Sequence, residues 1–154
     1  MPELVLISVF IISLVSIKLK RGNYKFAFAS RIGMAAMLLV TAGAHIAFDK
    51  GMALMIPAFI PYKLELVYIT GVIEAVAAIG LLISRYQRVT GWWLIVFFII
   101  LTPANIYAAI KHINIETATF DGEGLNYLWY RIPLQIFFIG WVYLSAINTK
   151  HFIH

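Results

Sequence analysis

YITGVIEAVAAIGLLIS, at residues 68–84, is an apolar stretch with one carboxylate, Glu74, near its middle. A run of this length and hydrophobicity is typical of a helix that crosses a membrane. An ionised side chain in such a helix costs about 2.5–3.5 kcal/mol on insertion scales, so it faces protein or water rather than lipid. Gly71, Glu74, Ala75 and Ala78 share one helix face, and small residues on a face let another helix approach. The sequence therefore predicts that Glu74 points into a helix bundle.

The composition indicates that the whole chain is one membrane domain. Of its 154 residues, 62% are hydrophobic and 12% are charged, and the mean hydropathy is +0.90. A soluble domain of this size cannot bury so much apolar side chain. The net charge of +5 does not point to nucleic acid, because the basic residues stand at the ends of apolar runs. Without cysteine, the chain needs a bound cofactor or a partner for any redox role.

The apolar runs predict an all-α polytopic membrane bundle with five spans, at residues 4–20, 26–48, 64–84, 90–110 and 127–147. The first run brings no charged or amide side chain to its interior, so we expect a four-helix core with this N-terminal helix added at its periphery. Between the second and third spans, residues 49–63 are apolar but are broken by Pro57 and Pro61. They form either an interfacial or re-entrant segment that caps the bundle, or a loop resting on lipid.

The basic residues predict an orientation. They follow the first, third and fifth spans, in the groups Lys18, Lys20, Arg21 and Lys25, then Arg85 and Arg88, then Lys150. Because cytoplasmic loops carry an excess of Lys and Arg, we expect the N-terminus outside and the C-terminus inside. Arg31, near the start of the second span, either extends to the lipid headgroups or turns inward.

With this orientation, polar side chains from four spans fall in the outer half of the membrane. At 1.5 Å per residue, Glu74 lies about 10–15 Å from the outer end of its span. The set is His45, Glu74, Asn105, Arg131 and Gln135. We therefore expect one polar pocket, covered by residues 49–63.

Three interpretations of this pocket follow from its residue types. A glutamate and a histidine in a low-dielectric pocket can exchange a proton, which makes Glu74 and His45 the candidate catalytic pair. The same residues can instead form a structural network in which Arg131 pairs with Glu74. A metal site is not expected, because His45 and Glu74 supply only two strong ligands. Tyr68 and Tyr107 either line a quinone pocket or anchor their helices at the interface.

Several short stretches carry a family resemblance. They are Arg31-Ile-Gly-Met, Ala42-Gly-Ala-His45, Met55-Ile-Pro57 with Pro61, Leu66-Val-Tyr-Ile-Thr-Gly-Val-Ile-Glu74, Pro103-Ala-Asn-Ile-Tyr107 and Arg131-Ile-Pro-Leu-Gln135. Together, over residues 28–147, the chain resembles the DoxX-like family of small bacterial membrane proteins, although Ile46 stands where that family often has an aromatic residue. The resemblance implies a four-helix core in a bacterial cytoplasmic membrane. Its namesake members are associated with a thiosulfate:quinone oxidoreductase, and some relatives with thiol or oxidative-stress systems.

The resemblance implies a subunit or accessory of a quinone-linked redox system, with a quinone or lipid-like ligand and a partner redox protein or a second copy of the chain. In this scheme Glu74 and His45 handle protons, Asn105 and Gln135 orient the ligand, and Arg131 balances charge. Two alternatives stay open at this point. One is a non-enzymatic scaffold or assembly subunit, and the other is a small-molecule carrier or an intramembrane proton-shuffling isomerase.

Overall fold

The chain is described by a computed structural model that covers residues 2–22 and 25–149. The described secondary structure is helical, apart from a single antiparallel bridge between Asn114 and Thr119. Its helices are α1 (Pro2–Arg21), α2 (Phe26–Ala47), α3 (Asp49–Leu54), α4 (Lys63–Leu82), α5 (Gln87–Ile110), α6 (Leu125–Val142) and the π-helical segment η1 (Tyr143–Ile147). Lys150, which belongs to the basic pattern of the sequence, lies outside the described residues.

The prediction of five long apolar helices is confirmed. α1, α2, α4, α5 and the continuous α6–η1 stretch are each long and apolar enough to cross a membrane. A helix of about 20 residues is about 30 Å long, which matches the hydrocarbon thickness of a bilayer. The outward surfaces of these helices carry large apolar side chains, such as Leu19 at 81% exposure and Trp93 at 70%. Lipid accommodates such side chains, whereas water does not.

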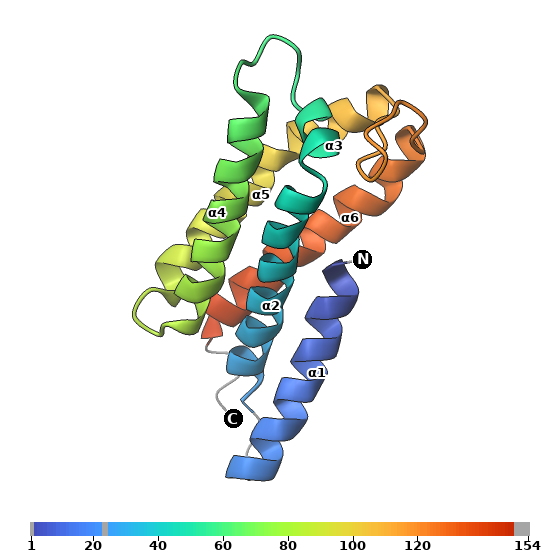
Figure 1. Cartoon of the computed structure of the whole chain (residues 1–154). Coiled ribbons are helices and arrows are strands. Elements are labelled where there is room, and N and C mark those ends of the chain that lie inside the picture. The colour runs from blue at the N-terminus through green and yellow to red at the C-terminus, as the bar shows by residue number, and fades with distance from the viewer. Residues whose placement is uncertain (1, 23–24, 150–154) are drawn as a thin grey trace.

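The long helices alternate in direction along the bundle, as Figure 1 shows. α3, residues 55–62 and the loop at residues 111–124 lie at the upper end, and the α4–α5 turn lies at the lower end. The most extensive contact between helices joins α2 to α4, and α2 also packs along α1. α1 is displaced downward, so that its first residues lie at mid-height beside α6.

Small residues set how closely α2 approaches its two neighbours. A Cβ atom on Gly33 would lie 2.7 Å from the carbonyl oxygen of Leu6, and one on Gly71 would lie 2.9 Å from the Cβ atom of His45. Both distances are shorter than a side chain allows, so glycine is what permits each contact. The apolar core then fills the space between the helices, with Met34, Met37, Leu38, Leu81, Leu94 and Val142 fully buried.

Candidate functional site

Most of the face of α4 that was predicted to point inward is buried, and Ala75 on this face is half-buried. Gly71, Glu74 and Ala78 are buried on this helix, and Glu74 is only 5% exposed. The facing residue of α2 is His45, whose Nδ1 lies 3.5 Å from Oε2 of Glu74. The same nitrogen lies 2.8 Å from the carbonyl oxygen of Thr41. Because a carbonyl only accepts, we assign the hydrogen to Nδ1, which donates it to Thr41. The Glu74 contact is then mainly electrostatic.

One oxygen of the Glu74 carboxyl group has no hydrogen-bond partner. Oε2 is buried and accepts no hydrogen bond from any described residue. Buried carboxyl oxygens are normally paired, and an unpaired one calls for an explanation such as a bound water or a catalytic role. This oxygen is the free acceptor of the site, and it faces the imidazole of His45.

Polar side chains from four helices meet beside Glu74, as the sequence predicted. They line a cavity of about 40 Å³ together with apolar side chains such as Phe98 and Phe138. The polar lining residues are Thr41 of α2, Glu74 of α4, Asn105 of α5, and Arg131 and Gln135 of α6. His45 does not line the cavity itself but contacts Glu74 at its edge. We call these six residues the polar cluster.

Gln135 and Thr102 both donate to the backbone of α5 beside the cluster. Nε2 of Gln135 donates a hydrogen bond to the carbonyl oxygen of Phe98 on α5, and the Thr102 hydroxyl donates to the same oxygen at 3.2 Å. Pro103 cannot donate a backbone hydrogen bond, so the carbonyl that loses its helical donor is that of Ile99, four residues earlier. The Gln135 and Thr102 side chains donate instead to the neighbouring carbonyl of Phe98, and the Gln135 hydrogen bond joins α6 to α5.

The sequence did not single out several residues that complete the site. The Tyr127 hydroxyl donates to Oδ1 of Asn105 at 3.2 Å. Pro2 lines the cavity, and the Tyr130 hydroxyl donates to the neighbouring Glu3. The N-terminal end of α1 thus closes one side of the cavity, although we expected α1 only at the periphery. A tyrosine near the start of the fifth span was the available signal, but interfacial tyrosines are too common to be specific.

Two expectations about the upper end of the bundle differ from the structure. No residue of 49–63 lines the cavity, so this segment does not cover it. It packs instead on α4 and on the 111–124 loop, where Gly51 meets the backbone of Ile115. Tyr68 and Tyr107 do not line the cavity either.

Tyr68 has a different partner, in α3. Its exposed hydroxyl donates to Oδ2 of Asp49 at 2.6 Å. This hydrogen bond, together with the backbone N–H of Lys50, holds the pKa of Asp49 below its ordinary value. The contact joins α3 to α4 at the end of the bundle and is separate from the polar cluster.

The size of the cavity limits what it can hold. A water molecule occupies about 30 Å³ in the liquid, so a cavity of about 40 Å³ holds about one water molecule and no quinone ring. Its residues can bind water, accept a proton on the free Glu74 oxygen and balance the charge with Arg131 or His45. Among the described residues, no three His, Asp or Glu side chains are grouped closely enough to hold a metal ion.

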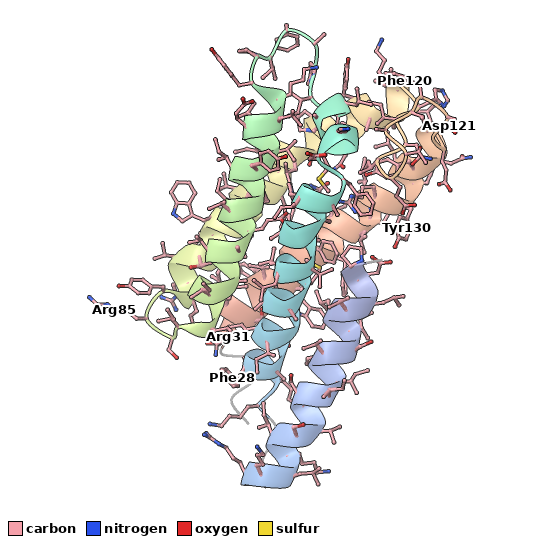
Figure 2. All side chains as sticks on the ribbon, viewed as in Figure 1. Phe28, Arg31, Arg85, Phe120, Asp121 and Tyr130 are labelled. Atoms are coloured by element: carbon pink, nitrogen blue, oxygen red, sulfur yellow. The ribbon has the colours of Figure 1, made fainter. Side chains whose placement is uncertain are left out.

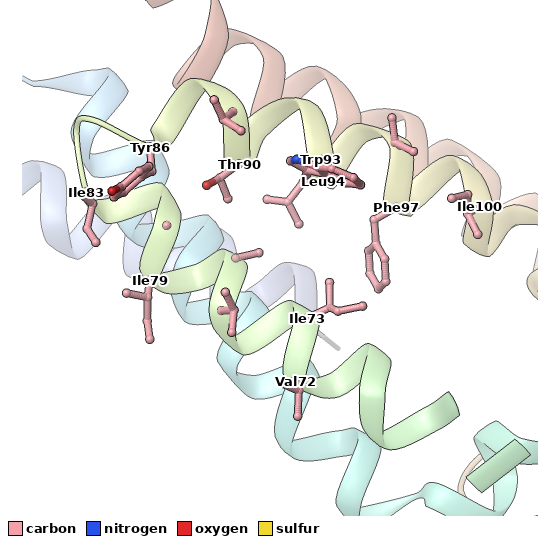
Figure 3. Close-up of a pocket in the computed structure, with 15 residues that line it drawn as sticks. Val72, Ile73, Ile79, Ile83, Tyr86, Thr90, Trp93, Leu94, Phe97 and Ile100 are labelled. Atoms are coloured by element: carbon pink, nitrogen blue, oxygen red, sulfur yellow. The ribbon is translucent and has the colours of Figure 1, made fainter. Parts of the chain in front are cut away.

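A larger hollow lies between α4 and α5, on their outward side (Figure 3). It has a volume of about 710 Å³, and its lining includes Ile73, Val76 and Ala77 of α4 and Trp93 and Phe97 of α5. We call it the α4–α5 groove. It shares no lining residue with the cavity, although Ala77 is one helical turn from Glu74. Its volume is in the range of small-molecule sites.

A comparison with known proteins supplies a family. A family model described as Domain of unknown function (DUF8561) matches residues 34–146, a range that includes the whole polar cluster. No curated protein and no solved structure matches the chain.

Proposed function

We propose that this chain, which belongs to the family described as Domain of unknown function (DUF8561), is an integral membrane subunit that binds and releases a proton at Glu74 and His45 for a quinone-linked redox system. The observation that carries the proposal is the free, buried Oε2 of Glu74, 3.5 Å from an imidazole nitrogen. This separation is longer than the roughly 2.6–3.2 Å of a direct proton transfer, and Nδ1 donates to Thr41, so the proposed transfer passes through one water molecule, which the adjacent cavity can hold. The polar cluster supplies the fixed dipoles that such a transfer needs.

The α4–α5 groove is the proposed place for the quinone or another lipid-like ligand. The cavity beside Glu74 is too small for a quinone ring, whereas the groove has the required volume and an apolar lining. The electrons would come from a partner redox protein, because the chain has no cysteine to carry them. The resemblance to the DoxX-like family supports this class of partner by analogy.

The proposed orientation has the N-terminus outside and the C-terminus inside a bacterial cytoplasmic membrane. The lower end of the bundle, where α1 ends and α4 turns into α5, carries seven of the eleven Lys and Arg residues that the structure describes and none of the seven Asp and Glu residues. Those seven are Lys18, Lys20, Arg21, Lys25, Arg31, Arg85 and Arg88. An end with cations and no carboxylates is expected on the cytoplasmic side. In this arrangement α2, α4, α5 and α6 form the core, and α1 is added to it.

The experiment is infrared difference spectroscopy of the protein in lipid nanodiscs between acidic and basic pH, with and without a short-chain ubiquinone analogue. We expect a carboxyl band that titrates in the wild type, disappears in Glu74→Gln and changes its midpoint when the analogue is added. Glu65→Gln is the matched control, because Glu65 is an exposed glutamate on the same helix. Val76→Trp, which fills the groove, removes the effect of the analogue, whereas the exposed Ile69 lies outside the groove and Ile69→Trp keeps it.

A scaffold is the second candidate function, and the contacts of Gln135 and Tyr127 favour it. Both side chains join α5 to α6 inside the bundle, as structural polar groups in membrane proteins do. A Glu74 carboxyl band that titrates with a midpoint unchanged by the ubiquinone analogue would contradict the link to a quinone. Absence of any titrating Glu74 band, with Glu74→Gln changing only the stability, would leave the scaffold as the function.

A further inference from the structure

Arg31 is a buried cation with no hydrogen bond or ion pair to the residues that the structure describes. Its side chain is 8% exposed, and its Nε and Nη1 atoms donate no hydrogen bond to any described residue. The guanidinium carbon lies 5.6 Å from the centre of the Phe28 ring, and Figure 2 shows both side chains at the lower end of α2. An aromatic face balances only part of a buried charge, and an unpaired buried ion is strongly unfavourable. The fold therefore leaves Arg31 with donors for an anion.

Arg31 lines a pocket that contains further cations. This hollow between α1 and α2 has a volume of about 600 Å³, and Lys20, Arg21 and Lys25 also line it. These three side chains are exposed, and no carboxylate is among the described lining residues. Four like charges around one hollow repel each other. The arrangement therefore favours binding of an anionic ligand and disfavours binding of a cationic one. We call this hollow the basic pocket.

The basic pocket has an apolar side as well. Ile12 and Ile32 line it together with the hydroxyls of Ser16 and Ser84, so it can contact both the polar and the apolar part of a ligand. Arg31 lies five residues into α2, about 8 Å along its axis. That depth is suited to a group just beneath the membrane surface. Basic pockets between transmembrane helices on the cytoplasmic side are known to bind phospholipid headgroups.

We propose that the basic pocket binds the phosphate group of an anionic phospholipid. The Arg31 donors contact the phosphate oxygens, because a guanidinium fork matches a phosphate better than an ammonium does. Lys20, Arg21 and Lys25 surround the headgroup, and the acyl chain follows the apolar wall of Ile12 and Ile32. This ligand would offset the charge of Arg31 and hold α1 against α2. It is a lipid site separate from the polar cluster and from the α4–α5 groove.

The test is native mass spectrometry of the full chain released from nanodiscs that contain equal amounts of phosphatidylglycerol and phosphatidylcholine. We expect the wild type to retain phosphatidylglycerol in preference to phosphatidylcholine. Arg31→Gln should lower this preference about fivefold, the equivalent of about 1 kcal/mol for one basic side chain. Arg85→Gln is the matched control. Arg85 lies at the same end of the bundle on the α4–α5 turn but does not line the pocket, so its loss should change the preference less than twofold.

Two further arms make the outcome decisive. Lys20→Gln combined with Lys25→Gln alters only exposed pocket residues, so it replaces Arg31→Gln if that variant does not fold. Because it removes two basic side chains, it should lower the preference at least about fivefold. Inorganic phosphate at the concentration of the lipid phosphate should not displace phosphatidylglycerol. Equal retention of the two lipids by the wild type, or equal losses in the Arg31 and Arg85 variants, would overturn the proposal. Displacement by inorganic phosphate would show that the pocket binds free phosphate rather than the phosphate group of a lipid, which contradicts the proposal.

Discussion

Replacing Gly71 with leucine is expected to lower the free energy of unfolding by about 3 kcal/mol, the upper range for overpacking. A Cβ atom at this position would lie 2.9 Å from the Cβ of His45 and 3.4 Å from the carbonyl oxygen of Ala42. Neither atom is at the flexible end of a side chain, so α2 and α4 must move apart. Because this is the most extensive helix pair, the change should also separate His45 from Glu74.

Gly43→Leu is the matched control for this prediction. Gly43 lies in α2, the helix that faces Gly71, but a Cβ atom at Gly43 has no neighbour within 4 Å. Both variants can be unfolded by titration with a denaturing detergent in mixed micelles. A loss of stability in Gly71→Leu no greater than that in Gly43→Leu would show that α2 and α4 do not approach each other at this glycine.

Replacing Glu74 with alanine is expected to lower the stability by about 3 kcal/mol, because it removes a buried carboxyl group from its contact with His45 and enlarges the cavity that Glu74 lines. Arg131, which lines the same cavity, also loses the nearby carboxyl group. Glu74→Gln keeps the shape and the hydrogen-bonding capacity, so its loss should be about 1 kcal/mol.

The same detergent titration measures this difference between the two variants. The exposed Glu65 on the same helix again provides a control, and Glu65→Ala should lie within about 0.5 kcal/mol of the wild type. If Glu74→Ala were as stable as Glu65→Ala, Glu74 would not be a buried and paired residue.

Much of the helical framework could be predicted from the sequence. An apolar run of spanning length has few alternatives to a helix, because every backbone polar group in lipid must be satisfied within its own segment. The inward face of α4 was predictable for a second reason. Gly71, Glu74 and Ala78 recur at the helical period, and an intramembrane carboxylate marks the side that faces protein.

The same helical period also places Tyr68 and Tyr107, which the sequence analysis considered as lining residues of a quinone pocket. Tyr68 lies six residues before Glu74, which turns it about 120° away from Glu74 on the helix. Tyr107 lies two residues after Asn105, on nearly the opposite side of α5. The helical period that placed Glu74 correctly also predicts that neither tyrosine faces the cavity, and neither lines it.

The parts that could not be predicted depend on contacts between distant segments. The axial displacement of α1 brings Pro2 and Glu3 to α6, and no local pattern in the first twenty residues specifies that shift. The same is true of residues 49–63. Pro57 and Pro61 show that this segment is broken, but only the packing of Gly51 on Ile115 shows that it lies over the 111–124 loop rather than over the cavity.

In the structure, α4 turns Glu74 toward α2 inside the bundle, and an engineered disulfide between the two helices reports that rotation. The chain has no cysteine, so Gly71→Cys combined with His45→Cys introduces a single thiol pair. The Cβ separation of 2.9 Å needs only a small relaxation to reach the disulfide range. We predict rapid intramolecular disulfide formation in lipid under mild oxidation, and little with Val72→Cys and His45→Cys, because Val72 is 62% exposed on the outward side. Faster crosslinking at Val72 than at Gly71 would mean that Glu74 faces lipid, which would contradict its position between α2 and α4.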